Sequence, residues 1–157
     1  MRCAALTVAR VVILAVAMAG VPRIAAAADA IEPGLWRINT RTATGLALGP
    51  PMASTKCLTA DQARDVAVTF SPVVGTINSE CAPIERTFVD GKLKWHLVCK
   101  GQLDMDMSGE FNFDSATHYT ATLHSKADMA GNTVVNSQNL IEATRVSDCP
   151  QGEPPTQ

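Results

Sequence analysis

The stretch that decides the fold runs from Leu103 to Phe113 and reads LDMDMSGEFNF. Every second residue of it, beginning with Leu103, is apolar or glycine, and the residues between are polar or charged. Successive side chains of a β-strand point to opposite faces, so this alternation predicts a strand with one buried and one solvated face. Such one-sided strands are typical of antiparallel sheets.

The neighbouring segments extend this pattern into a sheet. Ile84–Val89 and Lys92–Cys99 flank Asp90-Gly91, a dipeptide that favours a tight hairpin turn. His118–Ser125 and Thr133–Val146 have the composition of further strands and are separated by turn residues. Consecutive strands joined by short turns predict a mainly β fold, an antiparallel meander that curls or forms a partial β-barrel.

The first half of the domain adds two strands and one helix to this prediction. Leu35–Thr42 alternates like a half-buried strand, and Met52–Leu58 is a candidate second strand. Thr59 begins a capping-box sequence, so we expect one short α-helix that ends before Pro72. We expect Val73–Pro83 to be a loop.

The first 28 residues have the composition of a secretory signal peptide. Arg2 and Arg10 precede the apolar run Val11–Ala19, and small residues follow up to Ala28. The run is shorter than the roughly 20 residues that a membrane-spanning helix needs. We therefore expect cleavage after Ala28 and export to the periplasm, with the cell exterior as the alternative.

The charge balance excludes some classes of partner. The formal net charge is −2, and loss of the leader removes three arginines and no acidic residue. An acidic chain without a basic cluster is unsuited to nucleic acid. We expect one domain over residues 29–149, a disordered tail over residues 150–157, no nucleic-acid partner and no transmembrane segment.

Four cysteines remain after the leader, and the hairpin suggests how they pair. A chain that folds back at Asp90-Gly91 brings Cys81 opposite Cys99, or within one residue of it. We therefore predict the disulfide Cys81–Cys99, which leaves Cys57 to pair with Cys149. No Cys-x-x-Cys motif occurs, so neither a thioredoxin-type centre nor a typical zinc site is indicated.

Several short motifs resemble those of a known family. They are Pro33-Gly34-Leu35-Trp36, Cys57-Leu58-Thr59, Trp95 four residues before Cys99, Lys100-Gly101, Ser108-Gly109-Glu110 and Asp148-Cys149. In order and spacing they resemble the bacterial exported family catalogued as domain of unknown function 3617, over about Ile31 to Cys149. The resemblance implies export, disulfides and β architecture, and it carries over no catalytic residue.

Two groups of residues are candidates for metal binding. Asp104 and Asp106 imitate the first half of an EF-hand loop, but Ser115 stands where that loop needs a glutamate. Met105 and Met107 offer thioethers, which copper(I) accepts. A solvated strand face explains the aspartates and core packing explains the methionines. We predict no metal site and no cofactor, and a metal-handling protein stays as an alternative.

Enzyme motifs do not occur in the sequence. Of the three histidines, His96 has Glu85 as its nearest candidate partner, and we expect these two on different faces of the hairpin. His118 and His124 lie six residues apart along one expected strand, roughly 20 Å at strand rise. We predict no catalytic residue; a hydrolase of unrecognised type is the alternative.

The aromatic residues are the candidate ligand-binding set. Nearly all the aromatic area belongs to a few side chains, which can line an apolar pocket in a curled sheet or fill it. They are Trp36, Trp95, Phe111, Phe113 and Tyr119, with Phe88. The leading hypothesis is an exported, non-enzymatic module that binds a small apolar ligand or an envelope protein on the concave face of the sheet.

Overall fold

The structure is a computed structural model, and it describes residues 31–73 and 79–150. The predicted signal peptide lies outside these residues, as does the predicted tail from residue 151 onward. Neither helix in the described part of the chain is long and apolar enough to cross a membrane.

The described chain forms one nine-stranded antiparallel sheet and two short helices. Its elements are β1 (Gly34–Thr44), β2 (Ala47–Leu48), β3 (Met52–Leu58), α1 (Ala60–Arg64), α2 (Val66–Thr69), β4 (Ser79–Cys81), β5 (Glu85–Val89), β6 (Lys92–Gly101), β7 (Leu103–Ser115), β8 (His118–Met129) and β9 (Asn132–Ser147).

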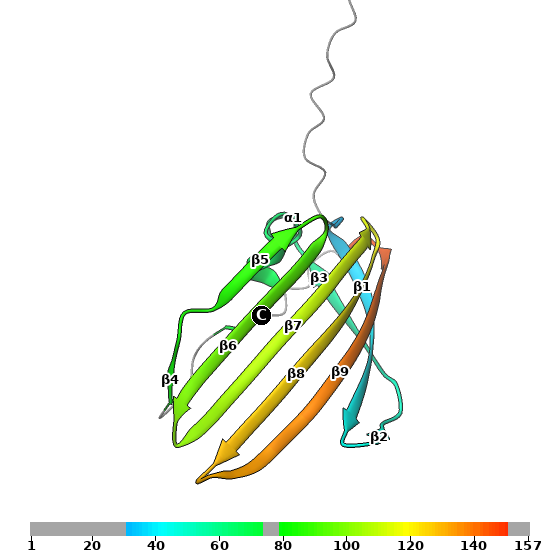
Figure 1. Ribbon diagram of the computed structural model, residues 1–157. Helices are drawn as coiled ribbons and strands as arrows, with labels where there is room; N and C mark the ends of the chain where they lie inside the picture. The colour runs from blue at the N-terminus through cyan, green and yellow to red at the C-terminus, as the bar shows by residue number, and fades with distance from the viewer. Residues whose placement is uncertain (1–30, 74–78, 151–157) are drawn as a thin grey trace, which may run out of the picture.

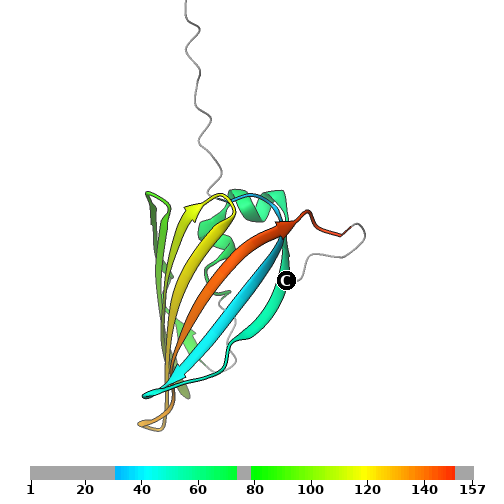
Figure 2. The same ribbon diagram turned by 90° about the vertical axis from the view of Figure 1, so that its right-hand side faces the viewer.

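The centre of the sheet is a meander, and the N-terminal strand β1 pairs with the last strand of that meander. Strands β5 to β9 pair in sequence order, and β1 then pairs with β9. Strands β2 and β3 continue beyond β1 at one edge, and β4 lies beside β6 at the other. The sheet curls without closing, and the helices lie on its concave side at one end (Figures 1 and 2). The predicted curled antiparallel meander is confirmed.

The deciding stretch forms β7 with the predicted alternation. Gly109, Phe111 and Phe113 are buried, whereas the residues between them are exposed. The hairpin turn is also confirmed, because Asp90 and Gly91 have φ angles of 50° and 70° and connect β5 to β6. Positive φ at both central residues matches the twist of the flanking strands.

The predicted single helix is split into two at Asp65. Thr59 and Gln62 form the expected capping box at the start of α1. Asp65 then leaves the helical conformation, with φ −110° and ψ 69°, and its carboxylate accepts a hydrogen bond from the amide of Val68 in α2. An aspartate carboxylate competes well for free amides at a helix start, which explains the break.

The region predicted as a loop, Val73–Pro83, contains a strand. Strand β4 pairs with β6, with Cys81 directly opposite Cys99. The two predicted disulfides are both present: Cys81–Cys99 spans 18 residues and Cys57–Cys149 spans 92. Cys99 is fully buried, whereas Cys57 and Cys149 are half-buried.

Candidate functional site

Aromatic rings fill the concave face where the helices cover it. Phe70, which follows α2, has its ring centroid 5.3 Å from that of Phe111, 5.4 Å from that of Phe113 and 5.1 Å from that of Tyr119. The Trp36 and Tyr119 centroids are 5.4 Å apart. We call this end, with Ala63 and Val66 of the helices, the covered end.

Two of the buried rings at the covered end carry a polar group, the indole N–H of Trp36 and the hydroxyl of Tyr119. Trp36 is 1% exposed, and its Nε1 donates a hydrogen bond to the carbonyl oxygen of Glu32 at 3.1 Å. Burial raises the pKa of Tyr119 to about 12, because the phenolate would lose its hydration. Four of the five aromatic residues predicted to bind a ligand therefore pack against one another at this end: Trp36, Phe111, Phe113 and Tyr119.

Trp95, the fifth predicted residue, is placed differently. It lies opposite Gly109, and a Cβ atom on that glycine would fall 2.4 Å from Cε2 of the indole. The indole ring therefore lies across the backbone of β7, which requires glycine there. Trp95 is 5% exposed, and its Nε1 is buried with no hydrogen-bond partner among the described residues.

Beyond Trp95 the lining of the concave face changes. We call this part the open end and define it by Met107, Leu123, Ser125, Ser137 and Asn139. Cross-strand pairing places these side chains on the concave side, and all five are half-buried. Figure 2 shows the helices at the other end of the curled sheet. The open end thus combines apolar and polar side chains, and neither described helix lies above it. Leu97, Cys99 and Ala127 lie on the same face but are buried.

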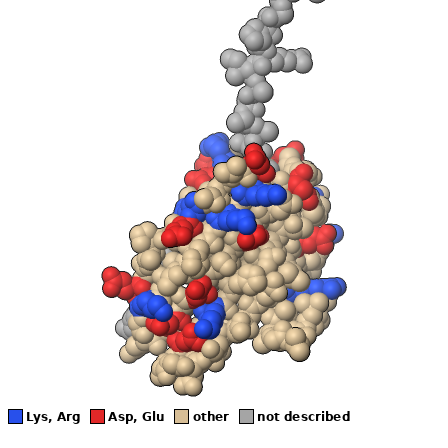
Figure 3. All heavy atoms as spheres, viewed as in Figure 1, with Lys and Arg blue, Asp and Glu red and all other residues tan. Residues whose placement is uncertain are grey.

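The outer face of the sheet carries paired charges. Lys94 Nζ lies 2.8 Å from Glu110 Oε1, and His96 Nε2 lies 2.9 Å from Asp106 Oδ1. Figure 3 shows basic and acidic side chains next to one another on this face. These side chains are largely solvent-exposed, so each pair contributes little to stability.

Glu85 and His96 share this outer face, which corrects the expectation that they lie on opposite faces. They are direct cross-strand partners, and Ser108 follows on the next strand. The three border a shallow hollow of about 290 Å³. Glu85 and His96 are both exposed, and the side chain of His96 forms a hydrogen bond with that of Asp106.

His118 and His124 do not form a joint site. Nδ1 of His118 lies 2.8 Å from the Asp114 carboxylate, and its Nε2 lies 3.6 Å from Glu142. The hydrogen bond with Asp114 raises the pKa of His118. His124 lies opposite Ser108 and Gln138, well along β8.

The candidate metal ligands are divided between the two faces. Asp104 accepts hydrogen bonds from the Gly101 amide and from Lys100, and these bonds lower its pKa. Met105 and Met107 point to the opposite, concave face and are half-buried. Within residues 31–73 and 79–150, no three His, Cys, Asp or Glu side chains come together as a metal site.

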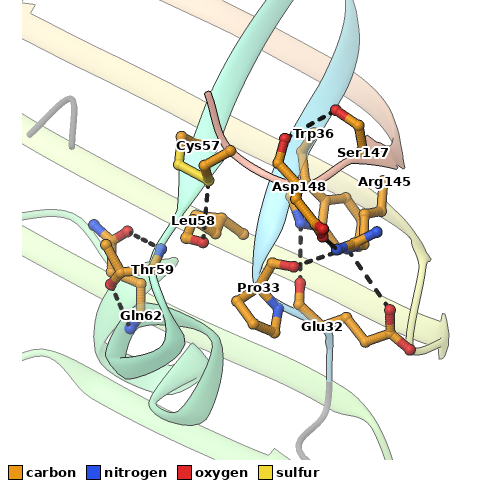
Figure 4. The surroundings of a disulfide bond; sticks show 11 residues. Glu32, Pro33, Trp36, Cys57, Leu58, Thr59, Gln62, Arg145, Ser147 and Asp148 are labelled. Atoms are coloured by element: carbon orange, nitrogen blue, oxygen red, sulfur yellow. Dashed lines mark hydrogen bonds and ion pairs between the residues drawn. A yellow bond between two sulfur atoms is a disulfide. The ribbon is translucent and has the colours of Figure 1, made fainter. Parts of the chain in front are cut away.

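The Pro33-Gly34 motif has a structural role near Cys57–Cys149, shown in Figure 4. Arg145 Nε donates a hydrogen bond to the carbonyl oxygen of Pro33 at 2.7 Å, and its Nη2 contacts Asp148. Gly34 has φ 143°, and a Cβ atom on it would fall 2.6 Å from Arg145 Nε. Arg145 thus joins the first strand to the last at the point where the disulfide also links the chain.

Sequence reasoning missed Arg145 and the pairing of Gly109 with Trp95. It assigned Phe70 to the apolar face of the predicted helix but left it out of the aromatic set. A usable signal existed for Gly109, because a glycine in the interior of a well-alternating strand often marks the close approach of another group. The sequence could not indicate which group approaches it.

Comparisons with known proteins identify a family. The family model described as "Protein of unknown function (DUF3617)" matches residues 31–149, which include every strand and both helices. No curated protein and no solved structure matches the chain. The match spans most of the chain, and the chain therefore belongs to the DUF3617 family.

Proposed function

We propose that this protein is an exported, non-enzymatic module that binds a small apolar ligand on the concave face of its sheet, at the open end. The half-buried apolar side chains of Met107 and Leu123, beside the packed aromatic rings, carry the proposal. The covered end is filled by its own aromatic rings, whereas Met107 and Leu123 stay half-buried beyond it. An apolar molecule that covers these side chains would remove their surface from water, which favours binding.

Polar groups among the apolar ones also support a binding surface. Ser125 and Ser137 face each other across β8 and β9, and Asn139 lies beside them. Ligand sites usually combine an apolar lining with a few polar groups that fix the orientation of the ligand. The open end has this composition, whereas the covered end does not.

The placement of titratable groups supports binding rather than catalysis. Glu85 and His96 lie exposed on the outer face, and the hydrogen bond of His118 is with Asp114. Electrostatic catalysis needs a preorganised site from which water is excluded. The three histidines lie on the face turned away from the concave lining.

The proposed location is the periplasm, on two arguments. The first 28 residues have the composition of a cleaved leader. The two disulfides suit an oxidising compartment, because cytosolic thiols are kept reduced.

Native mass spectrometry tests the proposal. Protein secreted to the periplasm and purified without reductant should weigh as the chain cleaved after Ala28 with two disulfides, plus a bound small molecule. Leu123→Glu places a charge at the open end and should abolish the added mass. Thr122→Glu, one residue away on the outer face, is the matched control and should keep it. A bare wild-type chain, or equal retention by both variants, contradicts the proposal.

A further inference from the structure

We infer that the indole N–H of Trp95 is the hydrogen-bond donor of this binding site, and that the ligand is an apolar molecule with a carbonyl-type acceptor. The inference rests on the proposed function and adds the chemical class of the ligand. It derives from a comparison of the two tryptophans of the chain.

Both indole groups are buried, but one has a partner and the other does not. Trp36 Nε1 donates to Glu32, whereas Trp95 Nε1 is sealed from solvent without an acceptor in the described chain. An indole nitrogen can only donate, so it needs an acceptor. A buried unpaired donor is costly, and native structures contain few of them.

The position of Trp95 connects this donor to the open end. The indole lies across Gly109, whose cross-strand neighbour on the far side is Leu123 and whose next concave residue along β7 is Met107. Trp95 therefore lies at the boundary between the packed rings and the half-buried side chains. A ligand seated on Leu123 and Met107 would have the indole at its edge.

No acceptor among the described residues pairs with the indole N–H, so a ligand can supply one. In the row that crosses the sheet from Trp95, the next side chain is Leu123, and Asn139 follows. Leu123 therefore separates Asn139 from the indole, and Oδ1 of Asn139 accepts a hydrogen bond from Thr42 at 2.6 Å. Because the indole N–H is buried, a neighbouring side chain must move to admit a ligand. Met107 is suited to this because its side chain is unbranched and flexible.

The side chains around the indole N–H indicate that the ligand is uncharged and mainly apolar. Met107 and Leu123 are apolar, and the concave row carries no charged side chain between Trp95 and Asn139. A carboxylate or phosphate would lose its hydration there without a counter-charge, which is expensive. A neutral ketone, ester or amide on an aliphatic body fits the donor and the lining.

The experiment uses two probes that differ in one carbonyl group, 2-undecanone and undecane. The secreted protein, cleaved after Ala28, is labelled with ¹⁵N and with ¹³C in Met and Leu methyl groups. Its two indole N–H signals are assigned with Trp95→Phe. We expect both probes to shift the methyl signals of Met107 and Leu123. Only 2-undecanone should move the Trp95 indole signal downfield, with the Trp36 signal unchanged as the internal control.

The Trp95→Phe variant supplies a second readout. Its affinity for 2-undecanone should fall about two- to twelvefold more than its affinity for undecane, the range that corresponds to one neutral hydrogen bond. Methyl shifts with both probes and a stationary Trp95 signal would overturn the inference and leave the proposed function standing. Methyl signals that respond to neither probe would overturn the proposed function, and the inference with it.

Discussion

The covered end and the open end of the concave face are made by the same strands, yet they differ in what lies above them. At the covered end Phe70 and the two helices close the space over Phe111, Phe113 and Tyr119. At the open end Met107 and Leu123 remain half-buried. Strand alternation determines which side chains face the concave side of the sheet. The two helices and Phe70, which follow β3 in the chain, cover those side chains at one end only.

Each end has its own disulfide, and removing them should give the largest effects. The pair Cys57→Ser with Cys149→Ser opens a 92-residue loop near the covered end, and Cys81→Ser with Cys99→Ser opens an 18-residue loop beside Met105. Chain entropy predicts a loss of about 4–5 kcal/mol for the first pair and about 3 kcal/mol for the second. Urea unfolding of the two double variants measures both; a larger loss for the Cys81–Cys99 pair would contradict this view.

Truncating one side chain at each end should destabilise the protein to different extents. Trp36→Ala removes a 1% exposed ring from the covered end and should cost about 3–5 kcal/mol. Leu123→Ala removes a half-buried side chain at the open end and should cost about 1 kcal/mol. Equal losses in urea unfolding would show that the open end is as tightly packed as the covered end.

Gly109→Ala should destabilise the protein at the boundary between the two ends, where Trp95 lies across this glycine. The added methyl group would lie 2.4 Å from the Trp95 ring, and overpacking of this kind costs about 1–3 kcal/mol. Ser108→Ala, on the same strand but on the outer face, is the control and should change stability by less than about 0.5 kcal/mol. Near-ultraviolet circular dichroism should report displacement of the indole in the glycine variant alone.

The smallest expected effect is the pH dependence of stability that arises from His118, which belongs to neither end of the concave face. Asp114 raises the pKa of His118 in the folded state, so the stabilisation is fully present below the unfolded pKa of about 6.5. It is lost as the pH rises through the raised folded-state pKa. The difference in stability between wild type and His118→Asn should therefore be larger at pH 5.5 than at pH 8.5. A pH-independent difference would mean that His118 titrates alike in both states.

Much of the fold could be predicted because its signals are local. The alternation of residues 103–113 predicts β7, and Asp90-Gly91 predicts the hairpin that brings Cys81 within one residue of Cys99. Thr59 and Gln62 predict the start of α1. Each of these signals depends on backbone geometry within a few residues, and tertiary contacts did not override it.

Register was harder to predict, and the outer face shows why. Cys81 pairs with Cys99, but Glu85 pairs with His96, so the alignment shifts by one residue between β4 and β5. Pro83 lies in the interruption and cannot donate a ladder hydrogen bond. A shift of one residue moves side chains to the other face, which placed Glu85 wrongly in the sequence prediction.

The candidate site was predictable only in part. The five aromatic residues were named from their area, but sequence gives no means to tell Trp36, which has an acceptor, from Trp95, which has none among the described residues. That distinction depends on Glu32 and Gly109, which lie on different strands or connections and meet the rings through the fold.

The pairing of β1 with β9 also determines the order in which the chain can fold. Arg37 lies opposite Thr144, so the first strand lacks this neighbour until nearly the whole domain has been synthesised. The hairpins from β5 to β8 connect nearby residues and can form earlier, together with Cys81–Cys99. Cys57 must wait for Cys149, and during that interval β1, β2 and β3 can pair only among themselves, which exposes this segment to misassembly.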